Sequence, residues 1–261
     1  MERISLQTII ASEENRSLLL FLDGGPKRFE ELIESLGKTE KQVFTNIELL
    51  RRWYLVTPEN DVYRLTTLGE LISEKLKPLL RIEEFMRAAE GYWLKINLDF
   101  IPPPLLKKLP HLNLCTVVRP NFHSIFDYNK DVHKKSLSSQ SFFMVAAALH
   151  PNFADMYSDL IENGINILLI FDSSLFEKAK RDNHEWLQKI IKNERVSLYV
   201  CPEEMQLLSF KVTDSCLAMR LLSKDGTYDH KQLVCYTADA VDWGKELFEY
   251  YRQQSVLITD I

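Results

Sequence analysis

The chain has 261 residues, of which 46% are hydrophobic, so it has enough apolar material for one or two folded domains. Its formal net charge of −5 excludes an overall basic nucleic-acid-binding protein, so any DNA-binding surface must gather its lysines and arginines on one face. The first residues lack the basic and apolar segments of a signal peptide, and charges interrupt the apolar stretches. We therefore expect a cytoplasmic protein that does not span a membrane.

Three short helices are predicted within the first 52 residues. The first, Ser12–Asp23, begins at its own N-cap serine and stops at a Gly-Gly-Pro sequence. The second, Arg28–Leu36, carries apolar residues at helical spacing and ends at Gly37, which supplies a left-handed residue. The third begins directly afterwards, because Thr39 and Gln42 have the spacing of a capping box.

A β-hairpin and a fourth helix follow. Two short β runs, 55–57 and 62–65, flank the turn-forming residues 58–61. The fourth helix has a predicted capping box over residues 67–70, and Pro78 is expected to kink or interrupt it. Residues 97–110 are predicted to be a linker, because three consecutive prolines fit neither a helix nor a central strand.

Beyond this linker, strands and helices alternate, which predicts an α/β fold. The predicted strands are 142–148, 165–171, 196–200, 210–213, 215–222 and 233–236, and the predicted helices are 153–161, 175–192 and 238–254. We therefore divide the chain into a winged helix-turn-helix domain (1–68), a helical and linker region for dimerisation (69–110) and an α/β sensor domain (111–261).

Helices followed by a hairpin form the winged helix-turn-helix order, in which the third helix enters the major groove of DNA. Glutamine and asparagine amides pair with adenine, while lysine and arginine bind phosphates or guanine. The candidate residues for binding double-stranded DNA are Lys38, Thr39, Lys41, Gln42, Thr45, Asn46, Arg51, Arg52 and Arg64. The alternative is a helical subdomain for packing or dimerisation, since Glu40 and Glu48 would repel phosphates.

Five segments carry a resemblance to a known family: Leu65–Gly69, Asn163–Ile170, Lys211–Asp214, Lys224–Asp229 and Ala240–Arg252. Over most of its length the chain resembles the archaeal winged-helix regulators common in methanogens. These regulators join an ArsR-like DNA-binding domain to a methanogenesis-regulator-type domain. The resemblance implies a dimeric DNA-binding regulator and no known effector. Arg220 departs from the small or apolar residue that relatives tend to carry on that strand.

The C-terminal order of strands and helices also looks like a degenerate phospholipase-D-type half. That chemistry uses a His-x-Lys-x-x-x-x-Asp motif, with histidine as the nucleophile and lysine on the phosphate. His133 and Lys135 match its first part, but Gln140 stands at the aspartate position and no second copy follows. We therefore expect no catalytic residue and no enzymatic activity, and a phosphodiesterase-like enzyme is only a third alternative.

Four aspartates raise the question of a metal site: Asp214, Asp225, Asp229 and Asp239. Turn and helix-cap chemistry explains them without a metal, so we expect neither a metal nor another cofactor.

The cysteines are Cys115, Cys201, Cys216 and Cys235. They have no zinc-ligand spacing, and in a reducing cytosol we expect four buried thiols. The alternative is a thiol sensor, which needs an exposed cysteine with a low pKa.

We expect the effector pocket at the carboxyl ends of the strands of the α/β domain. Phe143, Val145 and Phe171 would form its apolar floor, and His150, Ser173 and Ser174 would supply its polar groups. Arg220 would supply a cation for an anionic effector. The alternative is that the strand ends are simple turns and that Arg220 pairs with an acidic neighbour.

The dimer contact is predicted in the fourth helix and in the apolar stretch Leu76–Trp93, with Phe85 and Met86 among its residues. This stretch is too long for the small N-terminal domain to bury alone. The leading interpretation is thus a homodimeric, effector-responsive transcription regulator. The alternative is a protein-interaction module that keeps a winged helix but no longer binds DNA.

Overall fold

The computed structural model describes residues 6–120 and 129–261. The chain divides into two compact units, Met1–Glu83 and Glu84–Ile261, which we call unit 1 and unit 2. Residues 69–110 fall on both sides of this division.

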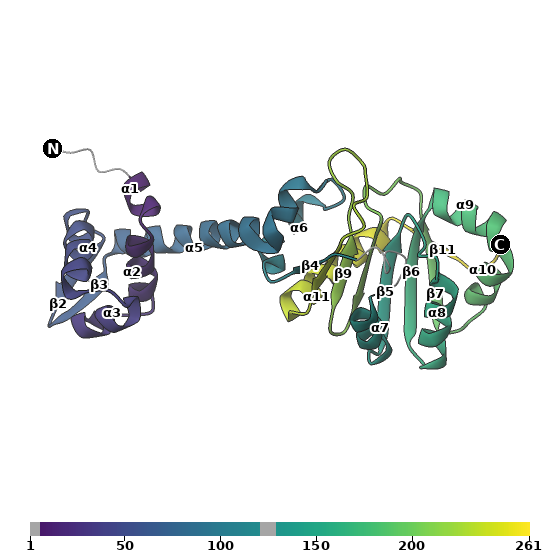
Figure 1. Ribbon diagram of the computed structural model, residues 1–261, viewed down its shortest axis with the longest axis horizontal. Coiled ribbons are helices and arrows are strands. Elements are labelled where there is room, and N and C mark those ends of the chain that lie inside the picture. Colours follow the sequence, from purple (N-terminus) through teal and green to yellow (C-terminus); the bar gives the residue numbers. More distant parts are fainter. Residues whose placement is uncertain (1–5, 121–128) are drawn as a thin grey trace. The chain divides into compact units, whose positions relative to one another are not determined.

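Unit 1 combines helices with a small antiparallel sheet of strand order β1-β3-β2 (Figure 1). Its elements are α1 (Leu6–Ala11), α2 (Glu13–Asp23), β1 (Lys27–Arg28), α3 (Phe29–Leu36), α4 (Glu40–Arg52), β2 (Val56–Glu59), β3 (Val62–Leu65) and the start of α5 (Thr67–Arg87). The predicted helices correspond to α2, α3, α4 and α5 and the predicted hairpin to β2 and β3, whereas α1 and β1 were not predicted.

Local capping interactions set the helix boundaries of unit 1. The Ser12 side chain accepts a hydrogen bond from the backbone of Asn15 and begins α2. Gly37 has φ 60° and ends α3, as its position predicted. Both bonds of the Thr39 and Gln42 capping box are present at the start of α4.

Helix α5 differs from its prediction at two places. Its first turn is capped by Thr66, whose hydroxyl accepts from the Gly69 backbone, and not by Thr67. The helix also continues through Pro78, so of the predicted kink or interruption the interruption is wrong. A proline removes only one helical hydrogen bond, and the buried side chain of Leu76 helps to hold α5 against the core of unit 1.

Unit 2 is built on an eight-stranded mixed sheet of order β11-β7-β6-β5-β8-β9-β10-β4. The strands are β4 (Thr116–Val118), β5 (Ser141–Ala146), β6 (Asn166–Asp172), β7 (Val196–Cys201), β8 (Ser209–Thr213), β9 (Leu217–Arg220), β10 (Gln232–Cys235) and β11 (Val256–Ile258). Strands β5, β6 and β7 are parallel and the other pairs are antiparallel. The predicted α/β class is confirmed as a mixed α/β fold.

Helices cover both faces of this sheet, so its strands have apolar residues on each side. The helices are η1 (Ala88–Lys95), α6 (Pro103–Leu106), η2 (Leu109–Leu112), α7 (Lys130–Leu137), α8 (Phe153–Glu162), α9 (Ser173–Asp182), α10 (His184–Ile191) and α11 (Ala238–Gln253). Helix α11 packs with Val145, Phe210 and Met219 on one face (Figure 1). Helices α8, α9 and α10 pack with Phe142 and Leu169 on the other.

Two local predictions for unit 2 are corrected. The segment 97–110 is not a free linker, because Phe100, Ile101 and Leu105 are buried in the core beside α11. Its prolines are accommodated because Pro103 and Pro104 occupy the first turn of α6, where no backbone donor is needed. The single helix predicted over 175–192 is two helices, α9 and α10, which are separated at Asn183.

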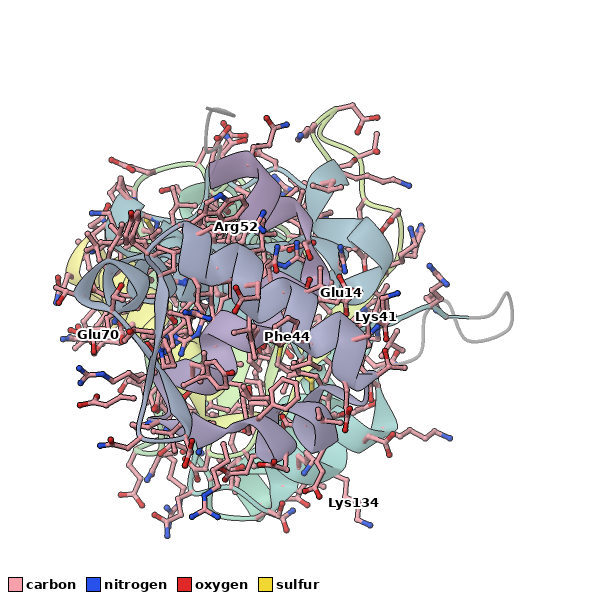
Figure 2. The ribbon with its side chains drawn as sticks, turned by 90° about the vertical axis from the view of Figure 1, so that its left-hand side faces the viewer. Glu14, Lys41, Phe44, Arg52, Glu70 and Lys134 are labelled. Atoms are coloured by element: carbon pink, nitrogen blue, oxygen red, sulfur yellow. A yellow bond between two sulfur atoms is a disulfide. The ribbon has the colours of Figure 1, made fainter. Side chains whose placement is uncertain are left out.

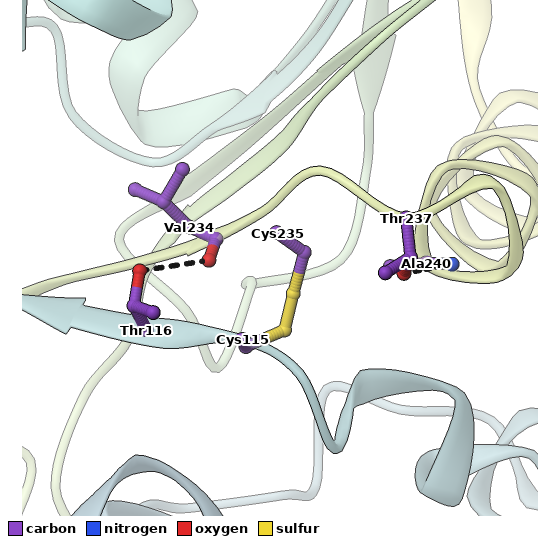
Figure 3. Close-up of a disulfide and its surroundings, with 6 residues drawn as sticks. All are labelled: Cys115, Thr116, Val234, Cys235, Thr237 and Ala240. Atoms are coloured by element: carbon purple, nitrogen blue, oxygen red, sulfur yellow. Dashed lines mark hydrogen bonds between the residues drawn. A yellow bond between two sulfur atoms is a disulfide. The ribbon is translucent and has the colours of Figure 1, made fainter.

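A disulfide joins Cys115 and Cys235 (Figure 3). The antiparallel pairing of β4 with β10 sets Thr116 opposite Val234, so the two cysteines face each other at the next position of the register. All four cysteines are buried. Cys201 and Cys216 are free thiols. The prediction of four thiols is therefore wrong for one pair, because strand register brings together cysteines that are 120 residues apart.

In the part of the chain that the structure describes, every helix is too short or too polar to cross a membrane.

Candidate functional site

Helix α4 turns one face away from the core of unit 1. Val43, Ile47 and Leu50 are fully buried, while Lys41 and Arg52 are exposed. Figure 2 shows Lys41 and Arg52 toward opposite ends of this helix, with Phe44 between them. The outer face of α4 therefore has the length and polarity of a surface that enters a DNA groove.

Several predicted DNA-binding residues are held by bonds within α4. The Gln42 Oε1 atom accepts from the Thr39 backbone N–H at 3.1 Å and from its hydroxyl at 2.9 Å. The Thr45 hydroxyl donates to the Lys41 carbonyl at 2.7 Å. Asn46 is only partly buried and lies one turn after Gln42, on the same side of the helix. The Asn46 amide is thus the better placed of the two predicted base readers.

Three of the predicted phosphate-binding cations already have acidic partners. These pairs are Lys38 Nζ with Glu14 Oε1 at 3.5 Å, Arg51 with Glu48, and Arg64 Nε with Glu59 Oε2 at 2.7 Å. Among the described residues, Lys41 and Arg52 form no ion pair. These two side chains are therefore the cations of α4 that are available to phosphates without breaking an existing contact.

Sequence reasoning missed the exposed aromatic residue on α4. Phe44 is 52% exposed and lines an open groove of about 860 Å³, which is also lined by Arg28, Phe29 and Glu30 and by the hairpin. Pro58, Asp61 and Tyr63 line the hairpin side of this groove. The available signal was its position in the sequence: Phe44 lies outside the core-facing spacing of Val43, Ile47 and Leu50.

Helix α5 carries an exposed apolar stripe in unit 1. Leu68, Leu71, Leu79 and Ile82 are 45–54% exposed. They repeat at a spacing of 11 residues, from 68 to 79 and from 71 to 82, which keeps them on one side of a straight helix. We call these four residues the α5 stripe.

The predicted dimer stretch Leu76–Trp93 is partly corrected. Leu76 is buried in the core of unit 1, and Phe85 and Trp93 are buried in the core of unit 2. Of the three aromatic and sulfur-containing residues proposed for the contact, Met86 alone is exposed. Most of the stretch therefore needs no partner to bury it, because its apolar residues are buried partly in the core of unit 1 and partly in the core of unit 2.

Only some residues of the predicted pocket lining share one concavity. A concavity of about 320 Å³ is lined by His150 and Ser174, together with Leu149, Phe153 and Lys178. It opens between the end of β5 and the start of α9, near the carboxyl ends of parallel strands.

The rest of the predicted pocket lies elsewhere. Phe143 and Val145 point to the sheet face covered by α11, and Phe171 is fully buried in the opposite core. The Ser173 hydroxyl donates to the Cys201 carbonyl at 3.2 Å. A strand that is buried on both faces is apolar at every position. The run 142–148 therefore has no alternation of polar and apolar residues that would show which side chains share a face.

A second, smaller cavity joins His150 to polar residues of β8, β9 and β10. Its polar lining consists of Ser209, Lys211, Arg220 and Gln232, and its apolar lining includes Met144, Met156 and Ala218. We call the four strand residues the polar row. Burial, followed by the nearby charge of Arg220, lowers the pKa of Lys211 to about 8. Burial also lowers the pKa of Arg220, while the nearby Tyr228 opposes this shift.

Lys211 was missed by sequence reasoning, although a signal was present. Lys211 is the charged residue of β8, and the other residues of this strand, from Ser209 to Thr213, are also buried. A lysine inside an otherwise buried strand is rare unless it is paired or functional.

The phospholipase-type motif is not assembled around His133. This residue lies buried on α7, with its Nε2 atom 3.0 Å from Asp159 Oδ2 on α8. The Lys135 ammonium lies 5.0 Å from the ring centre of Tyr236. Both motif residues thus have structural contacts.

The four aspartates have local or backbone contacts, and Asp229 accepts from the Lys231 backbone N–H at 3.1 Å. Asp225 accepts from Ser223 and Thr227, and these bonds lower its pKa to about 2. Asp214 accepts from the Gln140 backbone at 2.6 Å, and Asp239 lies in the first turn of α11. Across residues 6–120 and 129–261, no three metal-ligand side chains of the histidine, cysteine or acidic type come together.

Two solved structures have some likeness to this chain. One is TrmBL2, described as an archaeal chromatin protein with a novel mode of DNA binding, at 14% identity and a TM-score of 0.43 over 93% of each chain. The other is a phospholipase D family member, Nuc from Salmonella typhimurium, at 13% identity and a TM-score of 0.40 over 49% of this chain and 89% of that one.

The sequence comparisons match a regulator. A relative named methanogenesis regulatory protein FilR1, from Methanothrix harundinacea (strain 6Ac), is 26% identical over 256 residues. The match covers 96% of this chain, and this chain spans 57% of the length of that relative. Residues 125–254 of this chain match the family described as the middle domain of methanogenesis regulatory protein FilR1.

Proposed function

We propose that the chain is a cytoplasmic, homodimeric transcription regulator that binds DNA through unit 1 and an effector through unit 2. The observation that carries this proposal is the unpacked outer face of α4, which follows a tight joint at Gly37 and lies beside a hairpin. The name of the FilR1 relative, a regulatory protein, supports it. We read unit 1 as a winged helix of ArsR-like type and unit 2 as a degenerate phospholipase-D-type half without catalysis.

In this proposal Lys41 and Arg52 hold phosphates and Asn46 reads a base. A gel shift with the DNA upstream of its own gene, repeated over a range of salt concentrations, tests it, because phosphate contacts make binding fall steeply with salt. Binding that is absent, or that does not depend on salt, contradicts DNA recognition.

We expect Lys41→Ala and Arg52→Ala each to weaken binding to all sequences and to lower the salt slope by roughly 1. Asn46→Ala should instead lower affinity for the specific site by about 1–3 kcal/mol. Gln42→Glu keeps the acceptor that caps α4 but removes the amide and adds a negative charge, so it should weaken binding to all sequences. If Asn46→Ala lost the same affinity for the specific site and for unrelated DNA, Asn46 would not read a base.

We propose that the α5 stripe is the contact between the two copies. Four half-exposed apolar side chains along one helix face are what a second, identical helix covers in a two-fold dimer. Leu71→Glu combined with Ile82→Glu should give a monomer in sedimentation equilibrium at micromolar concentration. Arg81→Glu, which introduces the same charge on an exposed position beside the stripe, should leave the dimer intact. A monomeric unaltered chain contradicts the proposal.

A second candidate function is a protein-interaction module in which unit 1 no longer binds DNA. The exposed Phe44 in its groove and the acidic partners of Lys38, Arg51 and Arg64 favour it. The same salt-dependent gel shift separates the two candidates, since a protein-binding groove gives no DNA complex.

A further inference from the structure

Strand register gathers the polar row from three strands into one place. Ser209 on β8 is directly opposite Arg220 on β9, and Lys211 is directly opposite Ala218. The pairing of β9 with β10 continues to Gln232 beside Arg220. Ala218 also lines the cavity, and its small side chain leaves room beside Lys211.

The charges of this cavity are not balanced within the described chain. Lys211 is only 9% exposed and Arg220 is partly buried, yet the lining residues include no carboxylate. Neither cation forms an ion pair within residues 6–120 and 129–261. Burying a charge without a partner opposes folding, so two such cations side by side mark a place where a negative group belongs.

We infer that the cavity between Lys211 and Arg220 binds an oxyanion group, a phosphate or a carboxylate, of the effector. This inference rests on the sensory role proposed above for unit 2. Lysine, arginine, the Ser209 hydroxyl and the Gln232 amide supply hydrogen-bond donors from several directions, which suits an oxyanion. A phosphate monoester carries about −1.5 to −2 charges at pH 7 and matches the two cations.

The size of the cavity limits what enters it. Its free volume is about 20 Å³, which is close to the space needed for one water molecule. An oxyanion is larger than one water molecule, so it enters only when the ends of the Lys211 and Arg220 side chains move apart. His150 also lines the neighbouring concavity of about 320 Å³, and this is where we place the rest of the effector.

The test is thermal unfolding of the full chain in inorganic phosphate, in acetate and in chloride, at matched ionic strength. We expect phosphate or acetate to raise the Tm by several degrees over chloride, with a saturating dependence on concentration. Lys211→Met and Arg220→Gln should each lose this rise. Lys180→Met, the same change at an exposed lysine of α9, should keep it.

Comparison of variants is essential because phosphate stabilises many proteins without binding a site. A rise of equal size in Lys211→Met, or no rise with either anion, overturns the inference. A rise with phosphate alone assigns a phosphorylated effector, and a rise with acetate alone assigns a carboxylate. A gel shift separates the two proposals. If the unaltered chain binds no DNA while Lys211-dependent stabilisation persists, the regulator proposal fails and the anion site stands.

Discussion

Lys211→Met is expected to stabilise the anion-free protein by up to ~3 kcal/mol at pH 7. This is the free energy that corresponds to a pKa lowered from 10.5 to about 8. Methionine keeps most of the volume of the side chain and removes the unpaired charge, and such replacements of buried charges often stabilise a fold. Urea unfolding of both proteins in chloride measures the difference. A variant less stable than the unaltered chain would contradict a buried, unbalanced cation.

The stabilisation should depend on pH with a defined sign. Between pH 8 and 10.5 the unfolded chain holds a proton on Lys211 more often than the folded chain, so the free energy of unfolding rises with pH over this window. Below about pH 8 both states are protonated and the full destabilisation is present. The advantage of Lys211→Met should therefore be largest at pH 7 and shrink toward pH 10.

The groups that surround Lys211 set the controls for this measurement. Arg220 and His150 line the same cavity, and the Cys216 thiol lies close enough to raise the pKa of Lys211 slightly. Burial raises the pKa of Cys216, so this thiol is neutral at pH 7. Lys211 in turn lowers the pKa of Cys216, so the difference between the two proteins reports on Lys211 alone at pH 7, where this thiol is neutral. An advantage that stays constant from pH 7 to 10 would show that packing, and not charge, causes it.

Gly69→Ala is expected to destabilise unit 1 by about 3 kcal/mol, the upper part of the usual range for overpacking. An added Cβ atom would lie 2.1 Å from the Leu55 carbonyl oxygen and 3.3 Å from Leu65 Cβ. That oxygen accepts from the Thr66 backbone at 2.9 Å, so it is fixed by the same turn that starts α5. The helix must move away from the hairpin to admit one methyl group.

Thermal unfolding of Gly69→Ala, followed by a signal from unit 1, measures this effect. Gly24→Ala is the matched control, because its Cβ would be 3.4 Å from the nearest atom and its φ of −74° suits any residue. Anion stabilisation of unit 2 should persist in Gly69→Ala. A Tm within about 1 °C of the unaltered chain would show that α5 adjusts freely.

The sequence by itself determined the features that depend on neighbours within about four residues. The Ser12 cap, the left-handed Gly37 and the capping box of Thr39 and Gln42 were all predicted, because each needs only a local backbone path. The outward face of α4 and the mixed α/β class of unit 2 follow from the same local periodicities. The DNA-binding role of that face is still a prediction.

Only the tertiary structure decided which distant residues meet. The disulfide of Cys115 with Cys235 depends on the pairing of β4 with β10, and the separation of Phe85 from the α5 stripe depends on which core covers it. The polar row depends on the register of β8, β9 and β10, which sets Ser209 beside Arg220. A strand buried on both faces shows no alternation of polar and apolar residues. Its sequence therefore does not predict which side chains share a cavity.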